Sequence, residues 1–202
     1  MSADRRVEIR RQNRLFDDFF KIDELIVAHE RYDGGMSAEE RRLVFERGDA
    51  IAVLLFDEKA RAVVLVEQFR VPTLIARRRE RAASTDGWIV ELVAGMIDQG
   101  ETAEQAAIRE VFEETGYRIT DPRPIGQFFS SPGGSDERFF RYFAWVEDAQ
   151  RDGKGGGVAG EEDIKVFQRG IDDLFRELAR GTIEDPKLAI AAYWLKDNID
   201  RL

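Results

Sequence analysis

The chain has 202 residues and a formal net charge of -9, with 43% hydrophobic and 35% charged residues. This length and composition suit one domain, or one domain with a small appendage, and a sizeable core. The acidic excess argues against a nucleic-acid partner, because the phosphate backbone repels it, but leaves small phosphorylated substrates that bind with a cation. With no cysteine and only His29 as histidine, thiolate catalysis, disulfides and cysteine-based zinc sites are excluded.

Targeting and membrane signals are weak in this sequence. No run reaches the roughly 18 apolar residues of a membrane-spanning helix. The first residues lack the apolar core of a signal peptide. We therefore expect a cytoplasmic protein without a membrane partner. His29 has no nearby residues that suggest a catalytic triad, so we interpret it as a strand residue.

The first half of the chain predicts strands. Short extended segments with apolar residues are expected at residues 7–16, 19–29, 51–56, 62–69 and 88–93. The segments 51–56 and 62–69 are nearly all apolar, which predicts a hairpin buried on both faces. Residues 77–86 are rich in arginine and are predicted to form an exposed loop.

A helix is predicted at residues 103–115. Thr102 is placed to cap its first turn, Gln105 completes a capping box, and Gly116 occupies the position of a C-terminal cap glycine. The apolar face of this helix comprises Ala107, Ile108, Val111 and Phe112.

The second half alternates strands and helices. Strands are expected at residues 123–129, 138–146 and 164–168, a flexible glycine-rich loop at 151–162, and helices at about 171–180 and from Asp185-Pro186 onward. Together these elements predict an α/β (α+β) fold, in which helices sandwich a mixed β-sheet and an N-terminal antiparallel β appendage precedes it. We place the appendage at residues 1–48 and the main domain at residues 49–202.

Three glutamates share one side of the predicted helix. Glu110, Glu113 and Glu114 lie at i, i+3 and i+4, where like charges destabilise a helix and the helix dipole also disfavours anions. Such a cluster suits a hard divalent cation, which binds carboxylate oxygens and bridges to phosphates. Taken alone, the three residues are also compatible with a solvated acidic face.

The surroundings of this cluster form a recognisable motif. Gly95 is followed after five residues by Glu101, and after seven more by the segment 109–117, REVFEETGY. This spacing matches every specified position of the Nudix box, for which a chance match at a given start is on the order of 10⁻⁸. The chain therefore resembles the Nudix hydrolases, which hydrolyse a nucleoside diphosphate linked to another group, and a Nudix fold is expected, with the box at residues 95–117.

The resemblance implies a metal site and its ligands. The expected cofactor is Mg²⁺, with Mn²⁺ as a possible substitute. Residue by residue, it implies that Glu110 and Glu114 are principal ligands, Glu113 a further ligand, Glu101 a supporting one, and Ala94 a ligand through its carbonyl. Arg109 is expected to orient the cluster through Glu113, and both are counted among the expected catalytic residues.

A narrower resemblance covers most of the chain. Segments similar to bacterial ADP-ribose pyrophosphatases lie at residues 35–42, 45–48, 66–70, 91–96, 131–134 and 162–164, and Pro132 is a marker of that subfamily. GDP-mannose hydrolases share several of these segments, and the glycine run at 155–158 favours them. We expect hydrolysis of ADP-ribose to AMP and ribose 5-phosphate, with GDP-mannose or another nucleotide sugar as the alternative.

Substrate contacts also follow from the resemblance. Arg42 and Arg70 are expected to bind the diphosphate or the terminal ribose, since guanidinium groups fit phosphate oxygens; the alternative is ordinary surface charge. Phe19 or Phe20 could stack on the purine across a homodimer interface, or simply pack in a strand core. The remaining expected substrate contacts are Glu91, Met96 and Glu137.

The general base is expected on the glycine-rich loop, which could close over bound substrate. Glu161 and Glu162 are the candidates, and we favour Glu162. Relatives carry the base two residues before the glutamate that matches Glu162, and that position here is Gly160. The alternative is that both glutamates are solvated loop residues and that the base lies elsewhere, for example within the box.

A non-enzymatic function is the competing hypothesis. A catalytically inactive Nudix fold could bind a nucleotide sugar as a sensor. A sensor need not retain a repulsive acidic cluster, so the intact glutamates at 101, 110, 113 and 114 favour the enzyme. Cleansing of oxidised nucleoside triphosphates is disfavoured, because the N-terminal β region exceeds a minimal Nudix domain.

Overall fold

A computed structural model describes residues 5–80, 86–147, 151–158, 160 and 162–202. The chain divides into two compact units, which are described separately below. One unit comprises Met1–Asp49 and Phe128–Phe139, and the other comprises Ala50–Gln127 and Phe140–Leu202.

The first unit contains a three-stranded antiparallel sheet. Its strands are β1 (Val7–Asp17), β2 (Lys21–His29) and β3 (Glu40–Glu46), in the order β1-β2-β3. This confirms the extended segments expected near the N-terminus. Ion pairs cross the strands, such as Arg14 Nε to Asp23 Oδ1 at 2.5 Å and Arg41 Nε to Glu24 Oε1 at 2.5 Å. Opposite charges on neighbouring strands help to fix the register of this exposed sheet.

A turn from later in the sequence completes the first unit. The Phe45 N–H donates to the Gly134 carbonyl at 2.8 Å, and the Asp136 N–H donates to the Phe45 carbonyl at 3.3 Å. Arg138 Nε adds an ion pair to Asp49 Oδ1 at 2.9 Å. These bonds hold the 131–136 turn beside β3.

The second unit is built on a mixed sheet. Its strands are β4 (Ala50–Asp57), β5 (Ala62–Phe69), β6 (Trp88–Glu91), β7 (Val93–Met96), β8 (Arg123–Phe129), β9 (Arg138–Trp145) and β10 (Lys165–Gly170), although the last residues of β8 and the first of β9 belong to the first unit. The strand order is β10-β5-β4-β9-β8, with β6 paired to β5 and β7 paired to β4. Every residue of β4 is buried, which confirms the prediction that this hairpin is covered on both faces.

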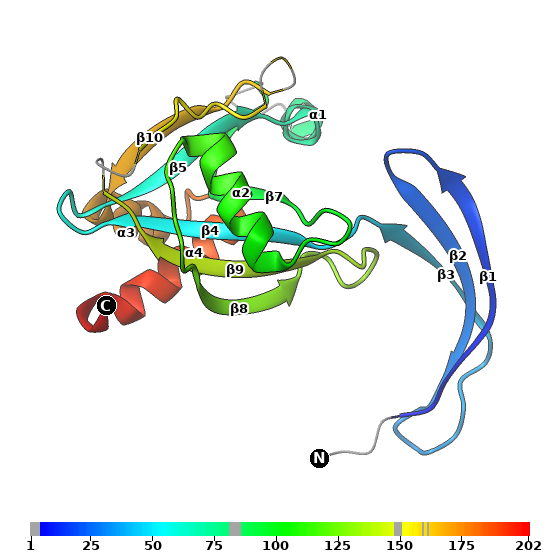
Figure 1. Ribbon diagram of the computed structural model, residues 1–202. Helices are drawn as coiled ribbons and strands as arrows, with labels where there is room; N and C mark the ends of the chain where they lie inside the picture. The colour runs from blue at the N-terminus through cyan, green and yellow to red at the C-terminus, as the bar shows by residue number, and fades with distance from the viewer. Residues whose placement is uncertain (1–4, 81–85, 148–150, 159, 161) are drawn as a thin grey trace. The chain divides into compact units, whose positions relative to one another are not determined.

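Helices cover the two faces of the sheet. Alternate side chains of a strand point to opposite faces, and Val53 and Leu55 of β4 share a core cluster with Val111 of α2 (Ala103–Thr115). On the other face, Phe56 lies near Phe143, which contacts Trp194 of α4. Figure 1 shows α2 in front of the sheet, with α3 (Ile171–Arg180) and α4 (Pro186–Asn198) behind it.

The segment 88–93 was expected to be one strand, and this is wrong at Leu92. Two short strands, β6 and β7, replace it, because β4 and β5 pair only near their shared turn and then diverge. Beyond that point β6 pairs with β5, and β7 pairs with β4. At Leu92, which is fully buried, the chain crosses the space between β5 and β4. As a result β7 continues to Met96, three residues beyond the expected end of the strand at Val93.

The exposed loop expected at 77–86 is wrong for residues 77–80 and right for Asp86, which is an exposed bend. Residues 77–80 belong to the helix α1 (Val71–Glu80), whereas 81–85 lie outside the described residues. Arginine is a good helix former and suits the last turn of a helix, but a helix with few apolar residues shows little periodicity in the sequence. Arg77 anchors this turn, donating to the Trp88 carbonyl at 3.0 Å and to Glu184 Oε2 at 2.5 Å.

The remaining helices confirm the predicted ends. Gly181 ends α3 with φ of 67°, and the Asp185 side chain accepts hydrogen bonds from the first turn of α4, with Pro186 at the first helical position. A 3-10 turn, Ile199–Arg201, follows α4. In the described part of the chain no helix is both long and apolar enough to cross a membrane.

Candidate functional site

The helix α2 carries the acidic cluster and is fixed at both ends. Thr102 and Gln105 form the predicted capping box, and Gly116 adopts the left-handed conformation with φ of 76°. An alanine at Gly116 would place its Cβ 2.2 Å from the Gly153 carbonyl oxygen, so this position requires glycine for two reasons. Val111 on one side of the helix is buried in the core. The glutamates therefore lie on the remaining faces, in a fixed register with β7.

Gly95 on β7 lies directly beneath one of these glutamates. A Cβ built on Gly95 would lie 1.9 Å from Glu110 Oε1, so only glycine leaves room for that carboxylate. The preceding residue of β7, Ala94, donates its backbone N–H to Glu114 Oε2 at 3.3 Å. The backbone of β7 is thus the surface against which the two carboxylates rest.

We predict that Gly95→Ala lowers catalytic turnover by at least about tenfold while unfolding changes little, because the flexible Glu110 side chain must move away from its present position. Kinetic assay and thermal unfolding of the same preparation measure the two effects. Gly170→Ala is the control, since its added Cβ meets only Asp173 Oδ2 at 3.9 Å. Unchanged turnover in Gly95→Ala would show that the position of Glu110 is not important.

Arg109 connects more carboxylates than its spacing along the helix predicts. Its guanidinium donates to Glu101 Oε2 at 2.9 Å, to Glu110 Oε1 at 2.8 Å and to Glu113 Oε2 at 3.1 Å. It also donates to the Met96 carbonyl at 3.0 Å. The expected pairing with Glu113 is present. The contacts to Glu101, Glu110 and Met96 depend on how the box loop folds back over the helix, which helical spacing does not reveal.

The carboxylates of α2 differ in their electrostatic environment. Burial raises the pKa of Glu114 well above its ordinary range, and the negative charge of Glu110 adds to this shift. Burial likewise raises the pKa of Glu110, although Arg109 partly offsets it. By contrast, hydrogen bonds from Arg109 lower the pKa of Glu101. Glu110 and Glu114 therefore form a buried acidic pair that a cation would stabilise.

The glycine-rich loop is attached to the C-terminal end of α2. The N–H groups of Asp152 and Gly156 donate to the carbonyls of Gly116 at 2.9 Å and Glu114 at 2.8 Å, and the Gly157 N–H donates to Glu113 at 3.1 Å. These bonds satisfy carbonyls that a helix end leaves without partners. The loop was expected to be flexible, but its first part is fixed to the helix that carries the glutamates.

Glu162 follows this attached segment. Its Oε2 accepts a hydrogen bond from the Val158 N–H at 3.0 Å. Its negative charge contributes to the raised pKa of both Glu110 and Glu114, so the three carboxylates lie within electrostatic range of one another. Glu161, the second candidate for the base, lies outside the described residues.

Arg70 and Glu91 form a pair next to this cluster. Arg70 Nε donates to Glu91 Oε2 at 2.8 Å, and the Arg70 charge lowers the pKa of Glu114. Glu91 is buried, so in the structure it contacts protein groups. Met96 contributes its carbonyl to Arg109. All the predicted site residues between 70 and 114, together with Glu162, therefore belong to one unit.

The other four predicted residues belong to the first unit. Phe19 is 81% exposed and packs edge-on against Phe20, whose ring also contacts Phe45. Arg42 is exposed and pairs with Glu40. Glu137 accepts a hydrogen bond from Ser130 Oγ at 2.6 Å. The alternative of packing in a strand core is wrong for Phe19 and Phe20, which are exposed and lie in the turn before β2. For Arg42, these observations favour neither substrate binding nor surface charge.

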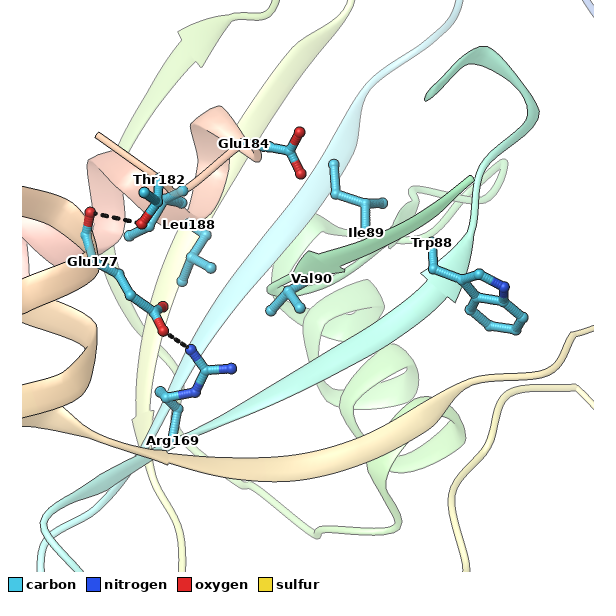
Figure 2. A pocket seen from close by; sticks show the side chains of 9 residues that line it. Trp88, Ile89, Val90, Arg169, Glu177, Thr182, Glu184 and Leu188 are labelled. Atoms are coloured by element: carbon cyan, nitrogen blue, oxygen red, sulfur yellow. Dashed lines mark hydrogen bonds and ion pairs between the residues drawn. The ribbon is translucent and has the colours of Figure 1, made fainter. Parts of the chain in front are cut away.

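A separate cavity lies between β6, β10 and the segment that leads into α4. Its volume is about 320 Å³, and Figure 2 shows Ile89, Val90 and Leu188 around it, with Arg169 paired to Glu177 at one side. None of the residues that line it is among the predicted site residues.

The donor set fits a divalent cation. Within the described residues, no three acidic or histidine side chains already gather as a metal site. Arg109 instead lies among Glu101, Glu110 and Glu113. However, Glu114 is only 3% exposed and lies close enough to Glu110 to feel its charge, and a carboxylate in that environment is costly without a positive charge. Hard oxygen ligands of this kind are those that Mg²⁺ and Mn²⁺ prefer.

Comparison with known families identifies the class. Residues 46–169 match the NUDIX domain, so the chain belongs to the NUDIX family. The match includes the whole box, and it confirms both the family and the mixed-sheet fold expected from the sequence.

Similarity to individual proteins extends over nearly the whole chain. The chain is 35% identical over 190 residues to the ADP-ribose pyrophosphatase of Escherichia coli (strain K12), covering 94% of this chain and 88% of that protein. It is 31% identical over 196 residues to the ADP-ribose pyrophosphatase of Haemophilus influenzae, covering 97% and 88%. It is also 32% identical over 184 residues to the GDP-mannose pyrophosphatase of Cronobacter sakazakii, covering 91% and 92%.

Proposed function

We propose that this protein hydrolyses the diphosphate bond of a nucleoside-diphosphate sugar, and that ADP-ribose plus water gives AMP and ribose 5-phosphate. The observation that carries the proposal is the buried pair Glu110 and Glu114 on the NUDIX helix, within electrostatic range of Glu162. Relatives named ADP-ribose pyrophosphatase that align over most of the chain support this substrate.

The metal in this proposal is Mg²⁺, with Mn²⁺ as a substitute. Glu110 and Glu114 hold it, supported by Glu113, Glu101 and the Ala94 carbonyl. When bound, the ion neutralises the diphosphate oxygens and makes a nearby water more acidic. Arg109 contacts both Glu110 and Glu101, so Glu110 would have to give up this contact to hold the ion, whereas Glu101 would keep its own.

The reacting groups are supplied by the chain itself. Arg70 binds diphosphate oxygens, since Glu91 engages its Nε and the outer nitrogens of the guanidinium can form charge-assisted hydrogen bonds. Glu162 takes the proton from the attacking water, because its charge acts on the acidic pair and the residue is itself exposed. Its bond from the Val158 N–H orients the carboxylate toward this role.

The second candidate substrate is GDP-mannose. Relatives named GDP-mannose pyrophosphatase align over a similar share of the chain, at 32% and 34% identity. The acidic site on α2 acts on the diphosphate that both substrates share, so it does not distinguish them. Base and sugar preference must come from other residues.

We also propose a cytoplasmic homodimer in which the N-terminal unit supplies the interface and the purine contacts. The support is the set of exposed apolar side chains on β1 and in the turn that follows it, Val7, Ile9, Leu15, Phe16 and Phe19. Exposed apolar surface is typical of interaction sites. Sedimentation of wild type and of an Ile9→Glu, Phe16→Glu variant tests the dimer. A variant with the same mass as wild type would contradict this interface.

The activity test uses a substrate panel with each metal. Purified protein is incubated with ADP-ribose, GDP-mannose, ADP-glucose or NADH and Mg²⁺ or Mn²⁺, and the nucleoside monophosphate released is measured. We expect the highest kcat/KM with ADP-ribose. Higher kcat/KM with GDP-mannose would establish the alternative substrate. Tight binding of a nucleotide sugar without turnover would instead establish the sensor and contradict the proposal.

A further inference from the structure

A buried lysine outside the box connects to the proposed site. Lys187, in the first turn of α4, places Nζ 2.8 Å from Asp185 Oδ1 and 3.1 Å from Glu91 Oε1. The lysine side chain is only 12% exposed, and those of Glu91 and Asp185 are 7% and 1% exposed. All three charges are therefore largely removed from water.

Local helix requirements do not account for this lysine. A cation in the first turn opposes the helix dipole, and burial of an ammonium group is costly. Asp185 already caps the helix by accepting from the N–H groups of Lys187 and Leu188, and that role needs no lysine side chain. Burial by itself lowers the pKa of Lys187, but Asp185 and Glu91 raise it overall, so the side chain stays charged.

Glu91 links Lys187 to Arg70. One carboxylate oxygen, Oε1, accepts from Lys187, and the other, Oε2, accepts from Arg70 Nε at 2.8 Å. The Arg70 side chain is 42% exposed, whereas Glu91 is buried. A buried carboxylate held by two cations cannot rotate freely, so Lys187 determines which oxygen is available to Arg70.

We propose that Lys187 is a positioning residue that acts through Glu91 to hold the Arg70 guanidinium toward the diphosphate of the substrate. This inference rests on the proposed function. Without Lys187, both oxygens of Glu91 can engage Arg70 in the bidentate geometry that arginine favours. The guanidinium then turns toward Glu91, and its outer nitrogens no longer face the substrate.

The test measures KM and kcat for ADP-ribose in Lys187→Met and Lys187→Arg. We expect Lys187→Met to raise KM by about tenfold, the worth of one charge-assisted hydrogen bond. Its kcat should stay within about twofold, because the acidic cluster is untouched. Lys187→Arg retains the charge and should restore KM to near the wild-type value. Lys59→Met is the matched control, since it removes a lysine from an exposed pair with Glu147 at the β4–β5 turn.

A double-mutant cycle tests the route through Arg70. In an Arg70→Gln background, Lys187→Met should have little further effect on KM. An equal rise in both backgrounds, or a Lys187→Met variant with wild-type KM, would overturn the inference. If Lys187→Met does not fold, Glu91→Gln supplies the test, and a wild-type KM there overturns it equally. A wild-type protein that turns over no nucleotide sugar contradicts the proposed function instead, so the two failures are distinguishable.

Discussion

Replacing Glu114 with glutamine is expected to lower kcat by on the order of 10³-fold while stabilising the metal-free protein. Loss of a metal ligand removes several kcal/mol of transition-state stabilisation, which corresponds to that factor. The stabilisation follows from burial, since the Glu114 side chain is buried and its pKa is raised. Glutamine has nearly the same volume and no charge, so the cost of a buried carboxylate disappears.

The pH dependence of this effect has a definite sign. Because the folded-state pKa of Glu114 is raised, the protonated form is favoured by folding. Its contribution to stability is full below the unfolded pKa and is lost as pH rises through the folded pKa. In a chelator at neutral pH, Glu114→Gln should therefore unfold at a higher temperature than wild type, and the difference should shrink at acidic pH.

Thermal unfolding with and without Mg²⁺ measures this prediction. Wild type should gain stability from the metal, whereas Glu114→Gln should gain much less, because ligands that bind only the native state raise its stability. Glu104→Gln is the control, since Glu104 lies exposed in the first turn of the same helix. An active Glu114→Gln variant, or one that Mg²⁺ stabilises as fully as wild type, would refute the role of Glu114.

Replacing Arg109 with leucine should destabilise the metal-free protein by about 2–4 kcal/mol, because it leaves the largely buried carboxylates of Glu101 and Glu110 without their cation. A loss of this size lowers the unfolding temperature by roughly 5–15 °C in a chain of this length. The three carboxylates affected are Glu101, Glu110 and Glu113. Mg²⁺ should recover part of the loss, since it supplies positive charge to the same groups.

Chemical denaturation in chelator and in Mg²⁺ checks this expectation. Arg109→Lys should be intermediate, because one ammonium group cannot reproduce a guanidinium that contacts three carboxylates and the Met96 carbonyl. Arg176→Leu removes an exposed pair with Asp173 and should change the free energy of unfolding by less than about 1 kcal/mol. If Arg109→Leu and Arg176→Leu were equally stable, Arg109 would not be holding the cluster together.

Local signals in the sequence predicted the box helix well. Its capping box, its C-terminal glycine and its acidic face depend on residues within a few positions of one another, and all were found where expected. The buried β4–β5 hairpin was equally clear, because continuous apolar runs of this length are typical of strands buried on both faces.

Features that depend on distant residues were missed. The helix α1 lacks an apolar stripe, and the split between β6 and β7 follows from the divergence of β4 and β5. The contact of Lys187 with Glu91 joins residues 96 positions apart. Nothing near either residue in the sequence indicates that pairing. The sequence likewise does not indicate that Arg109 contacts several carboxylates at once.

The pairing of β5 with β6 has a consequence for changes in chain length. Phe69 lies opposite Trp88, and the Arg70 N–H donates to the Gly87 carbonyl at 2.8 Å, so the excursion that contains α1 leaves and rejoins the sheet at one place. A connection whose two ends are held together can be lengthened at small entropic cost. Homologues with a longer or shorter connection between β5 and β6 can therefore keep the same strand register. A reporter peptide inserted into this connection should leave the acidic helix in place.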